Sequence, residues 1–290
     1  MGTGAEGDDD GVSRPPAESR RVNRRKGRHE ASRAVRRDLG SYPDESSRII
    51  YLAAEGERTE ADYIKLINDT YRDGQGEKFF LRFTPVRKGL RPDQVVAHVI
   101  AQASSPNDEK WALFDRDSED NRDKAIRDAM STAAREGVQV ALSHPSIELW
   151  LLLHFQQFTS QEEGRSGTIK DRLRKHPKAD GFAEYDTKSG GRGKGLAGQR
   201  GQTLLGKEQT AVDNARKLVD LCPHGTCSAK NLKLDKIPGP RTETYEEWNR
   251  RSGHADGCDP LKRDPSTDLW RLLASLGIGT RKARTPGGRR

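Results

Sequence analysis

Two carboxylates, with one residue between them, end the short apolar stretch Lys110–Asp117. Runs of this kind are typical of buried strands in parallel sheets, and the functional groups of open α/β sheets lie just beyond the strands' carboxyl ends. Asp115 and Asp117 would then face a crevice, where a divalent cation commonly relieves the repulsion between neighbouring carboxylates. We predict that both bind Mg²⁺ or Mn²⁺; helix caps or solvated surface acids are the alternative.

A repeated strand–helix pattern surrounds this stretch. β-branched and aromatic residues predict strands at 48–54, 78–86, 110–115 and 138–143. Caps and apolar periodicity predict helices that begin at Thr59, Pro92, Asp120 and Ser146, with Thr59 as the N-cap of the first. Short connections between these elements favour an α/β fold with a parallel four-stranded sheet that helices cover on both faces.

The parallel order brings further polar groups to the same edge of the sheet. Glu55 follows the first strand, and the turn 143–148 follows the fourth. Glu148 lies in an otherwise apolar helix start, where burial of a carboxylate costs several kcal/mol unless it is paired or ligates a metal. It would complete the metal site or pair with Arg58 or Arg116, and both arginines are also predicted contacts to a nucleic acid. A solvent-facing Glu148, favoured by the helix dipole, is the alternative.

The regions outside this core have a different composition. Residues 1–47 are polar and basic, which predicts a disordered tail; an arm that contacts phosphates is the sharper interpretation. We expect the catalytic core at 48–158 and a C-terminal part at 159–276. That part would hold helices near 169–173, 208–221 and 266–276, with an irregular stretch at 223–265. The tail 277–290 is basic and expected to fray.

Charge and composition narrow the classes of function. The chain has 290 residues and a net charge of +8, which makes a nucleic acid partner plausible. A flexible basic loop at 187–206 would contact the phosphate backbone through Lys188, Arg192, Lys194 and Arg200; a solvated linker is the alternative. No apolar run approaches the roughly 20 residues of a membrane span. The absence of a signal peptide and an odd number of cysteines, three, predict a reducing cytoplasm.

Cysteines and histidines near the C-terminus allow a second metal site. Cys222, Cys227, His254 and Cys258 could supply four soft ligands to Zn²⁺. Their spacing is irregular, and His224 is another possible ligand. Ordinary thiols in a loop are the alternative interpretation.

Three blocks in order resemble a known family. They are Ala54-Glu55-Gly56-Glu57-Arg58-Thr59-Glu60, Trp111-Ala112-Leu113-Phe114-Asp115-Arg116-Asp117, and the segment from Ala141 to Phe155. The first two resemble the Toprim domain of topoisomerases, bacterial primases and OLD-family nucleases. All three are similar to the RloB-like family, from about residue 48 to 276. Asp264-Pro265-Ser266-Thr267 resembles a family element usually written Asn-Pro-Ser-Thr.

The resemblance implies roles for these residues. Glu55 would be the general acid/base of phosphodiester chemistry, with Asp115 and Asp117 as Mg²⁺ ligands. RloB-like proteins are typically encoded beside an ATPase in phage-defence loci, so a nuclease effector is expected. His144 replaces the usual Asn of the third block, where it could still hydrogen-bond a nucleic acid substrate. The competing hypothesis is a non-catalytic subunit that senses nucleotides or nucleic acid, and nucleotidyl transfer fits less well.

Overall fold

The computed structural model describes residues 47–73, 78–85, 89–105, 107–117, 121–161, 165–188, 193–230, 232 and 244–279. The expected tails at 1–47 and 277–290 therefore lie almost entirely outside the described residues, and Arg192 of the expected basic loop does as well. Among the described residues, no helix has both the length and the apolar character needed to cross a membrane.

The described strands form one sheet in the order β2-β1-β3-β4-β5. They are β1 (Arg48–Ala54), β2 (Phe79–Phe83), β3 (Glu109–Asp115), β4 (Val138–His144) and β5 (Ser266–Thr267). The first four are parallel, whereas β5 runs antiparallel to β4. The α/β architecture is confirmed. The expected four-stranded parallel sheet is wrong at one edge, because the antiparallel strand β5 is added beside β4.

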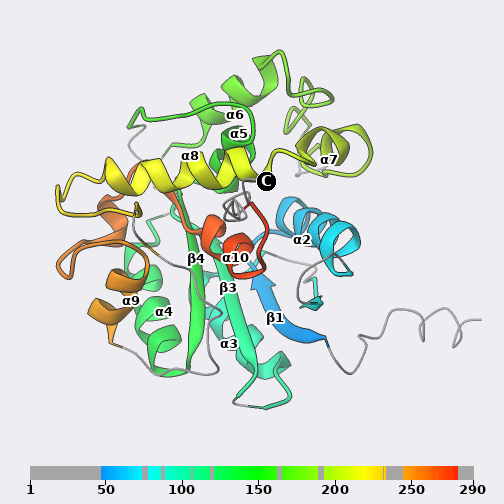
Figure 1. The fold of residues 1–290 in the computed structure, drawn as a ribbon. Coiled ribbons are helices and arrows are strands. Elements are labelled where there is room, and N and C mark those ends of the chain that lie inside the picture. The colour runs from blue at the N-terminus through cyan, green and yellow to red at the C-terminus, as the bar shows by residue number, and fades with distance from the viewer. Residues whose placement is uncertain are drawn as a thin grey trace, which may run out of the picture. The chain divides into compact units, whose positions relative to one another are not determined.

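Helices cover both faces of the sheet (Figure 1). They are α2 (Thr59–Tyr71), α3 (Pro92–Gln102), α4 (Asp123–Arg135), α5 (Ile147–Leu153), α6 (Gly167–Lys175), α7 (Gln199–Leu204), α8 (Glu208–Asp220), α9 (Tyr245–Arg251) and α10 (Leu269–Ser275), with a 3-10 turn, η3, at Pro260–Lys262. Thr59, the expected N-cap, is instead the first helical residue after Arg58.

Alternate residues of β3 pack into two separate cores, which explains its continuous apolar run. Trp111 and Leu113 join the core made with α2, α5, α8 and α10. Ala112 and Phe114 join the core made with α3 and α4. The first core also contains residues from both sides of position 158, so the apolar packing is continuous across the boundary expected there.

The C-terminal part departs most from the sequence-based expectation. Ser266 and Thr267 were expected in a helix, but they pair with His144 and Ser143 of β4. The Ser143 and Thr267 hydroxyls also lie 3.1 Å apart. Two residues are too short for an alternating pattern, and only the partner strand makes them extended. The stretches expected to be irregular contain α7 and α9.

Candidate active site

A cavity of about 560 Å³ lies at the carboxyl edge of the sheet. Its acidic lining residues are Glu55, Glu57, Glu60, Asp115, Asp117, Glu148 and Asp186. Its basic lining residues are Arg58, Arg122, Lys170 and Lys194. Among the described residues, carboxylates thus outnumber cationic groups by seven to four. Such a surplus of negative charge favours the binding of a cation.

Asp115 occupies the point where β3 ends, between β1 and β4. Its Oδ2 accepts a hydrogen bond of 3.1 Å from the Ile147 N–H at the start of α5. Loss of hydration raises the pKa of Asp115 well above its usual value, and the nearby carboxylates of Glu60 and Glu148 raise it further. The ionised form is therefore destabilised in the absence of a cation.

Glu60 and Glu148 bring two buried carboxylates to the same cavity, with exposed fractions of 7% and 3%. Burial, with a smaller contribution from Glu148, raises the pKa of Glu60 to about 7. The Tyr185 hydroxyl donates a hydrogen bond of 3.1 Å to Glu148 Oε1, and Lys194 Nζ lies 3.8 Å from the same oxygen. Glu148 is therefore buried as one interpretation expected, but its described partners are Tyr185 and Lys194 in place of the expected Arg58 or Arg116.

Glu55 is held at the end of β1 by both its backbone and its side chain. Its N–H donates to the Leu113 carbonyl oxygen at 3.0 Å, and its Oε2 accepts from the Asp115 N–H at 3.4 Å. Its Oε1 forms an ion pair with Arg122. A carboxylate and a guanidinium therefore share one wall of the cavity, and a phosphate group could compete for the guanidinium.

The part of the chain after residue 159 supplies the opposite wall. Lys170 of α6 pairs with Asp186 at 2.9 Å, and Lys194 lies 3.7 Å from the same carboxylate. The Thr59 hydroxyl contacts the Tyr185 hydroxyl at 2.9 Å and donates to the Lys194 carbonyl oxygen at 3.1 Å. The cavity is therefore built jointly by the predicted core and the C-terminal part.

Several predicted substrate-binding residues lie elsewhere. Arg116 pairs with Asp123 at 3.2 Å and is not among the lining residues. Arg200 donates to the carbonyl oxygens of Gly181 and Gly195 at 2.7 and 2.8 Å, so it braces its own loop. Lys188 is exposed outside the cavity. Of the predicted basic contacts, Arg58 and Lys194 line the cavity itself.

His144 is buried at the end of β4, with an exposed fraction of 2%. Neither ring nitrogen has a hydrogen-bond partner among the described residues. Burial, reinforced by the charge of Arg116, lowers the pKa of His144 to about 3, so the ring is neutral. A side chain this inaccessible cannot touch a nucleic acid in this structure, contrary to what the sequence suggested.

The sequence-based prediction missed Glu60, Lys170 and Asp186. A signal for Glu60 was present, since Glu60, Tyr63, Ile64 and Ile67 follow the helical spacing of one buried face. Gly56 supports this placement, because a Cβ atom there would collide with the Glu60 carboxylate. No local pattern marks Lys170 or Asp186, which reach the cavity only through the tertiary fold.

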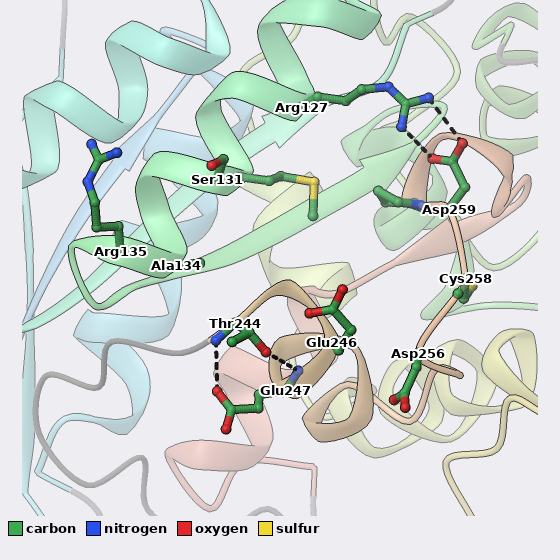
Figure 2. Close-up of a pocket in the computed structure, with 13 residues that line it drawn as sticks. Arg127, Ser131, Ala134, Arg135, Thr244, Glu246, Glu247, Asp256, Cys258 and Asp259 are labelled. Carbon is green, nitrogen blue, oxygen red and sulfur yellow. Dashed lines mark hydrogen bonds and ion pairs between the residues drawn. The ribbon is translucent and has the colours of Figure 1, made fainter.

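A larger cavity of about 870 Å³ lies between α4 and α9, away from the carboxylates (Figure 2). Arg127 and Asp259 form a bidentate ion pair at its edge, with distances of 3.0 and 3.3 Å. Thr244 and Glu247 form a capping box at the start of α9. These interactions stabilise helix ends and loops, so this cavity is a weaker candidate for catalysis than the acidic one.

The acidic cavity suits a hard divalent cation. Its donors are carboxylate oxygens, which Mg²⁺ and Mn²⁺ prefer. The Ser146 hydroxyl oxygen also lines the cavity, is buried, and has no hydrogen-bond partner among the described residues. A buried polar atom without a partner is costly and is commonly satisfied by water or a ligand.

Comparison with known proteins gave one match. A family model described as RloB-like protein matches residues 50–276, which is most of the chain. Neither the curated proteins nor the solved structures contain a match.

Proposed function

The chain belongs to the RloB-like protein family, and from its site we propose that it is a Mg²⁺-dependent phosphodiesterase that cleaves DNA or RNA on a Toprim-like α/β domain. The observation that carries the proposal is the gathering of Asp115, Glu60 and Glu148 around one cavity, where Glu148 raises the cost of ionising Glu60 and both raise the cost of ionising Asp115. Bound cations remove that cost, and phosphodiester chemistry uses them.

Asp115, Glu60 and Glu148 are the residues that would hold the metal, and Asp117 lines the same cavity. When bound, Mg²⁺ or Mn²⁺ supplies Lewis acidity toward the scissile phosphate. The Ile147 N–H orients the Asp115 carboxylate through its hydrogen bond, and Tyr185 orients that of Glu148. These contacts fix the oxygens that face the cavity.

Glu55 and Arg122 would act on the substrate directly. Arg122 binds a phosphate oxygen in exchange for its ion pair with Glu55. The released Glu55 carboxylate accepts a proton from the attacking water as the new phosphorus–oxygen bond forms. The bond to the leaving oxygen breaks, and that oxygen takes up a proton from solvent water. Arg58, Lys170 and Lys194 bring positive charge to the same cavity and would neutralise neighbouring phosphates.

In the biological setting that we propose, the enzyme is a phage-defence or abortive-infection effector that works with a partner ATPase in the cytoplasm. The net charge of +8 favours a nucleic acid substrate. The test is a cleavage panel of single- and double-stranded DNA and RNA, including tRNA. Each is incubated with Mg²⁺, Mn²⁺ or chelator, with and without the neighbouring ATPase. Metal-dependent cleavage supports the proposal, and its absence under every condition refutes it.

One observation favours the alternative, a non-catalytic subunit that senses nucleotides or nucleic acid. Glu55, the expected acid/base, is engaged by Arg122 and by the Asp115 N–H. A permanent ion pair would leave the cavity able to bind phosphates without hydrolysing them. Tight binding of an oligonucleotide or nucleotide without cleavage, together with a change in the ATPase rate of the partner, would identify this function.

A further inference from the structure

Three cysteines and one histidine, none of which lines the acidic cavity, converge in the C-terminal part of the chain. The ligand atoms of Cys222, Cys227, His254 and Cys258 all lie within 4.8 Å of one another, and all four residues are buried. Cys222 and Cys227 follow α8, whereas His254 and Cys258 follow α9. The two segments lie side by side (Figure 1), and the Ser228 N–H donates to the Gly253 carbonyl oxygen at 2.8 Å.

The distances between these atoms match a tetrahedral zinc site. Zn–S bonds of about 2.3 Å in a tetrahedron place two sulfurs ~3.8 Å apart. Cys222 Sγ and Cys258 Sγ are 3.6 Å apart, and His254 Nδ1 is 3.6 Å from Cys258 Sγ. A disulfide requires a sulfur–sulfur distance of about 2.05 Å. None of these three sulfurs is joined to another in a disulfide, so oxidation does not explain their convergence.

The surroundings supply the hydrogen bonds that zinc thiolates usually accept. The Ala255 N–H donates to Cys227 Sγ at 3.3 Å, and Arg263 Nε donates to Cys258 Sγ at 3.2 Å. Arg263 is itself buried, with an exposed fraction of 3%. Three thiolates and one Zn²⁺ carry a net negative charge, which the guanidinium beside them offsets. Donors of this kind orient the ligands and stabilise their ionised form.

The spacing agrees with this geometry. Four residues separate Cys222 from Cys227, and three separate His254 from Cys258. Both intervals fall within those of zinc sites built from two ligand pairs. His224 Nδ1 lies 3.3 Å from both Cys222 Sγ and Cys258 Sγ, but His224 is only half-buried. It is the competing fourth ligand.

We infer that Cys222, Cys227, His254 and Cys258 form a structural Zn²⁺ site that clips the end of α8 to the chain after α9. Four buried protein ligands leave no open position for a substrate, so the site is structural. The clipped segment leads directly into β5, which pairs with Ser143 and His144 next to the turn that precedes α5. The site therefore holds the outer strand of the sheet beside the acidic cavity. The same segment places Cys258 in the wall of the larger cavity (Figure 2).

The first test is the zinc content of the full chain, expressed without a His tag and purified without chelator. We expect one zinc per chain by elemental analysis, and loss of that zinc in Cys227→Ser and Cys258→Ser. Wild-type protein that holds no more zinc than these variants overturns the inference. The test remains valid if a variant fails to fold, because wild-type protein without bound zinc would by itself overturn the inference.

Two further measurements locate the site. Cobalt substitution of the wild-type chain should give the intense visible bands of a tetrahedral site with three thiolates; a weak octahedral spectrum contradicts it. His254→Cys should keep one zinc and His224→Asn should keep it too, whereas His254→Asn should lose it. Zinc lost only with His224→Asn overturns the assignment of His254. Asp115→Asn should keep the zinc, which separates this site from the proposed nuclease.

Discussion

The Tyr185 hydroxyl lies 3.1 Å from Glu148 Oε1 and donates a hydrogen bond to it. Glu148 belongs to α5, directly after the last parallel strand, whereas Tyr185 follows α6. The same hydroxyl contacts Thr59 at 2.9 Å. One side chain from the C-terminal part thus orients a carboxylate of the predicted core. The acidic cavity depends on that part for its geometry as well as for the positive charge of Lys170 and Lys194.

We predict that Tyr185→Phe destabilises the protein by about 1.5–3 kcal/mol, since hydrogen bonds to buried charged groups contribute that much. The affinity for Mn²⁺ should also fall, because Glu148 loses its orientation. Urea unfolding and calorimetric Mn²⁺ titration measure the two effects. Tyr51→Phe is the matched control; its hydroxyl contacts Ser104 and Arg82 away from the cavity, so it should alter stability alone. Equal Mn²⁺ affinity in Tyr185→Phe and wild type would contradict the role of Tyr185.

The raised pKa of Glu60 predicts an unusual dependence of stability on pH. Its pKa rises from 4.5 to about 7 on folding, so the folded state binds more protons than the unfolded state between these values. The free energy of unfolding of the metal-free protein should therefore decrease as pH rises through this window. The decrease is about 3 kcal/mol for Glu60 alone, at 1.36 kcal/mol per pKa unit. Asp115, with its pKa shifted in the same direction, adds to it.

Chemical denaturation in chelator at pH 5 and pH 7.5 measures this difference. Glu60→Gln should flatten the dependence, because glutamine does not titrate. Added Mg²⁺ or Mn²⁺ should stabilise the wild-type protein most at pH 7.5, where the carboxylates are ionised. If the metal-free protein has the same free energy of unfolding at pH 5 and pH 7.5, the environment of Glu60 does not raise its pKa.

Gly56 leaves room for the Glu60 carboxylate, so a side chain at position 56 should disturb the proposed cation site. A Cβ at this position would collide with the Glu60 carboxylate, so Gly56→Ala must displace that group. We predict weaker Mn²⁺ binding and at least a tenfold loss of cleavage. Gly89→Ala is a close control within the same cavity, where the nearest atom to a new Cβ is the Glu55 carbonyl oxygen at an ordinary 3.6 Å. Equal Mn²⁺ affinities of the two variants would contradict this reason for the glycine.

The sequence predicts the site well where local patterns and the rules of parallel sheets apply. β1 to β4 follow from apolar runs, and Glu55 and Asp115 lie at strand ends that a parallel sheet must bring to one edge. Glu60 could have been predicted only by extending the buried face of α2 to include a charged residue. No local pattern marks Lys170 on α6 or Asp186 in the loop that follows, since only the tertiary fold of the C-terminal part brings them to the cavity. β5 is too short for a pattern and exists only through its pairing with β4.

Arg122 offers a test of how the substrate is held. Its ion pair with Glu55 leads us to expect that a substrate phosphate takes over the guanidinium. Arg122→Gln should lower kcat/KM by about 10- to 100-fold, in line with the 1.5–3 kcal/mol of a hydrogen bond to a charged group. It should also reduce the salt dependence of binding. Arg127→Gln, which removes an ion pair with Asp259 at the other cavity, should leave kcat/KM unchanged. Similar losses in both variants would refute a specific phosphate contact.

The most direct test of the nuclease proposal compares cleavage by wild type, Asp115→Asn and Asp128→Asn in Mg²⁺ and Mn²⁺. Asp128 is exposed on α4, where it pairs with Lys124, so it controls for the chemical change alone. We predict that Asp115→Asn lowers the cleavage rate by about 100-fold or more, since a catalytic metal contributes several kcal/mol. Without metal, Asp115→Asn should be at least as stable as wild type, because asparagine does not ionise and so avoids the cost of burying a charge at this position. Cleavage by Asp115→Asn at the wild-type rate would contradict the proposal.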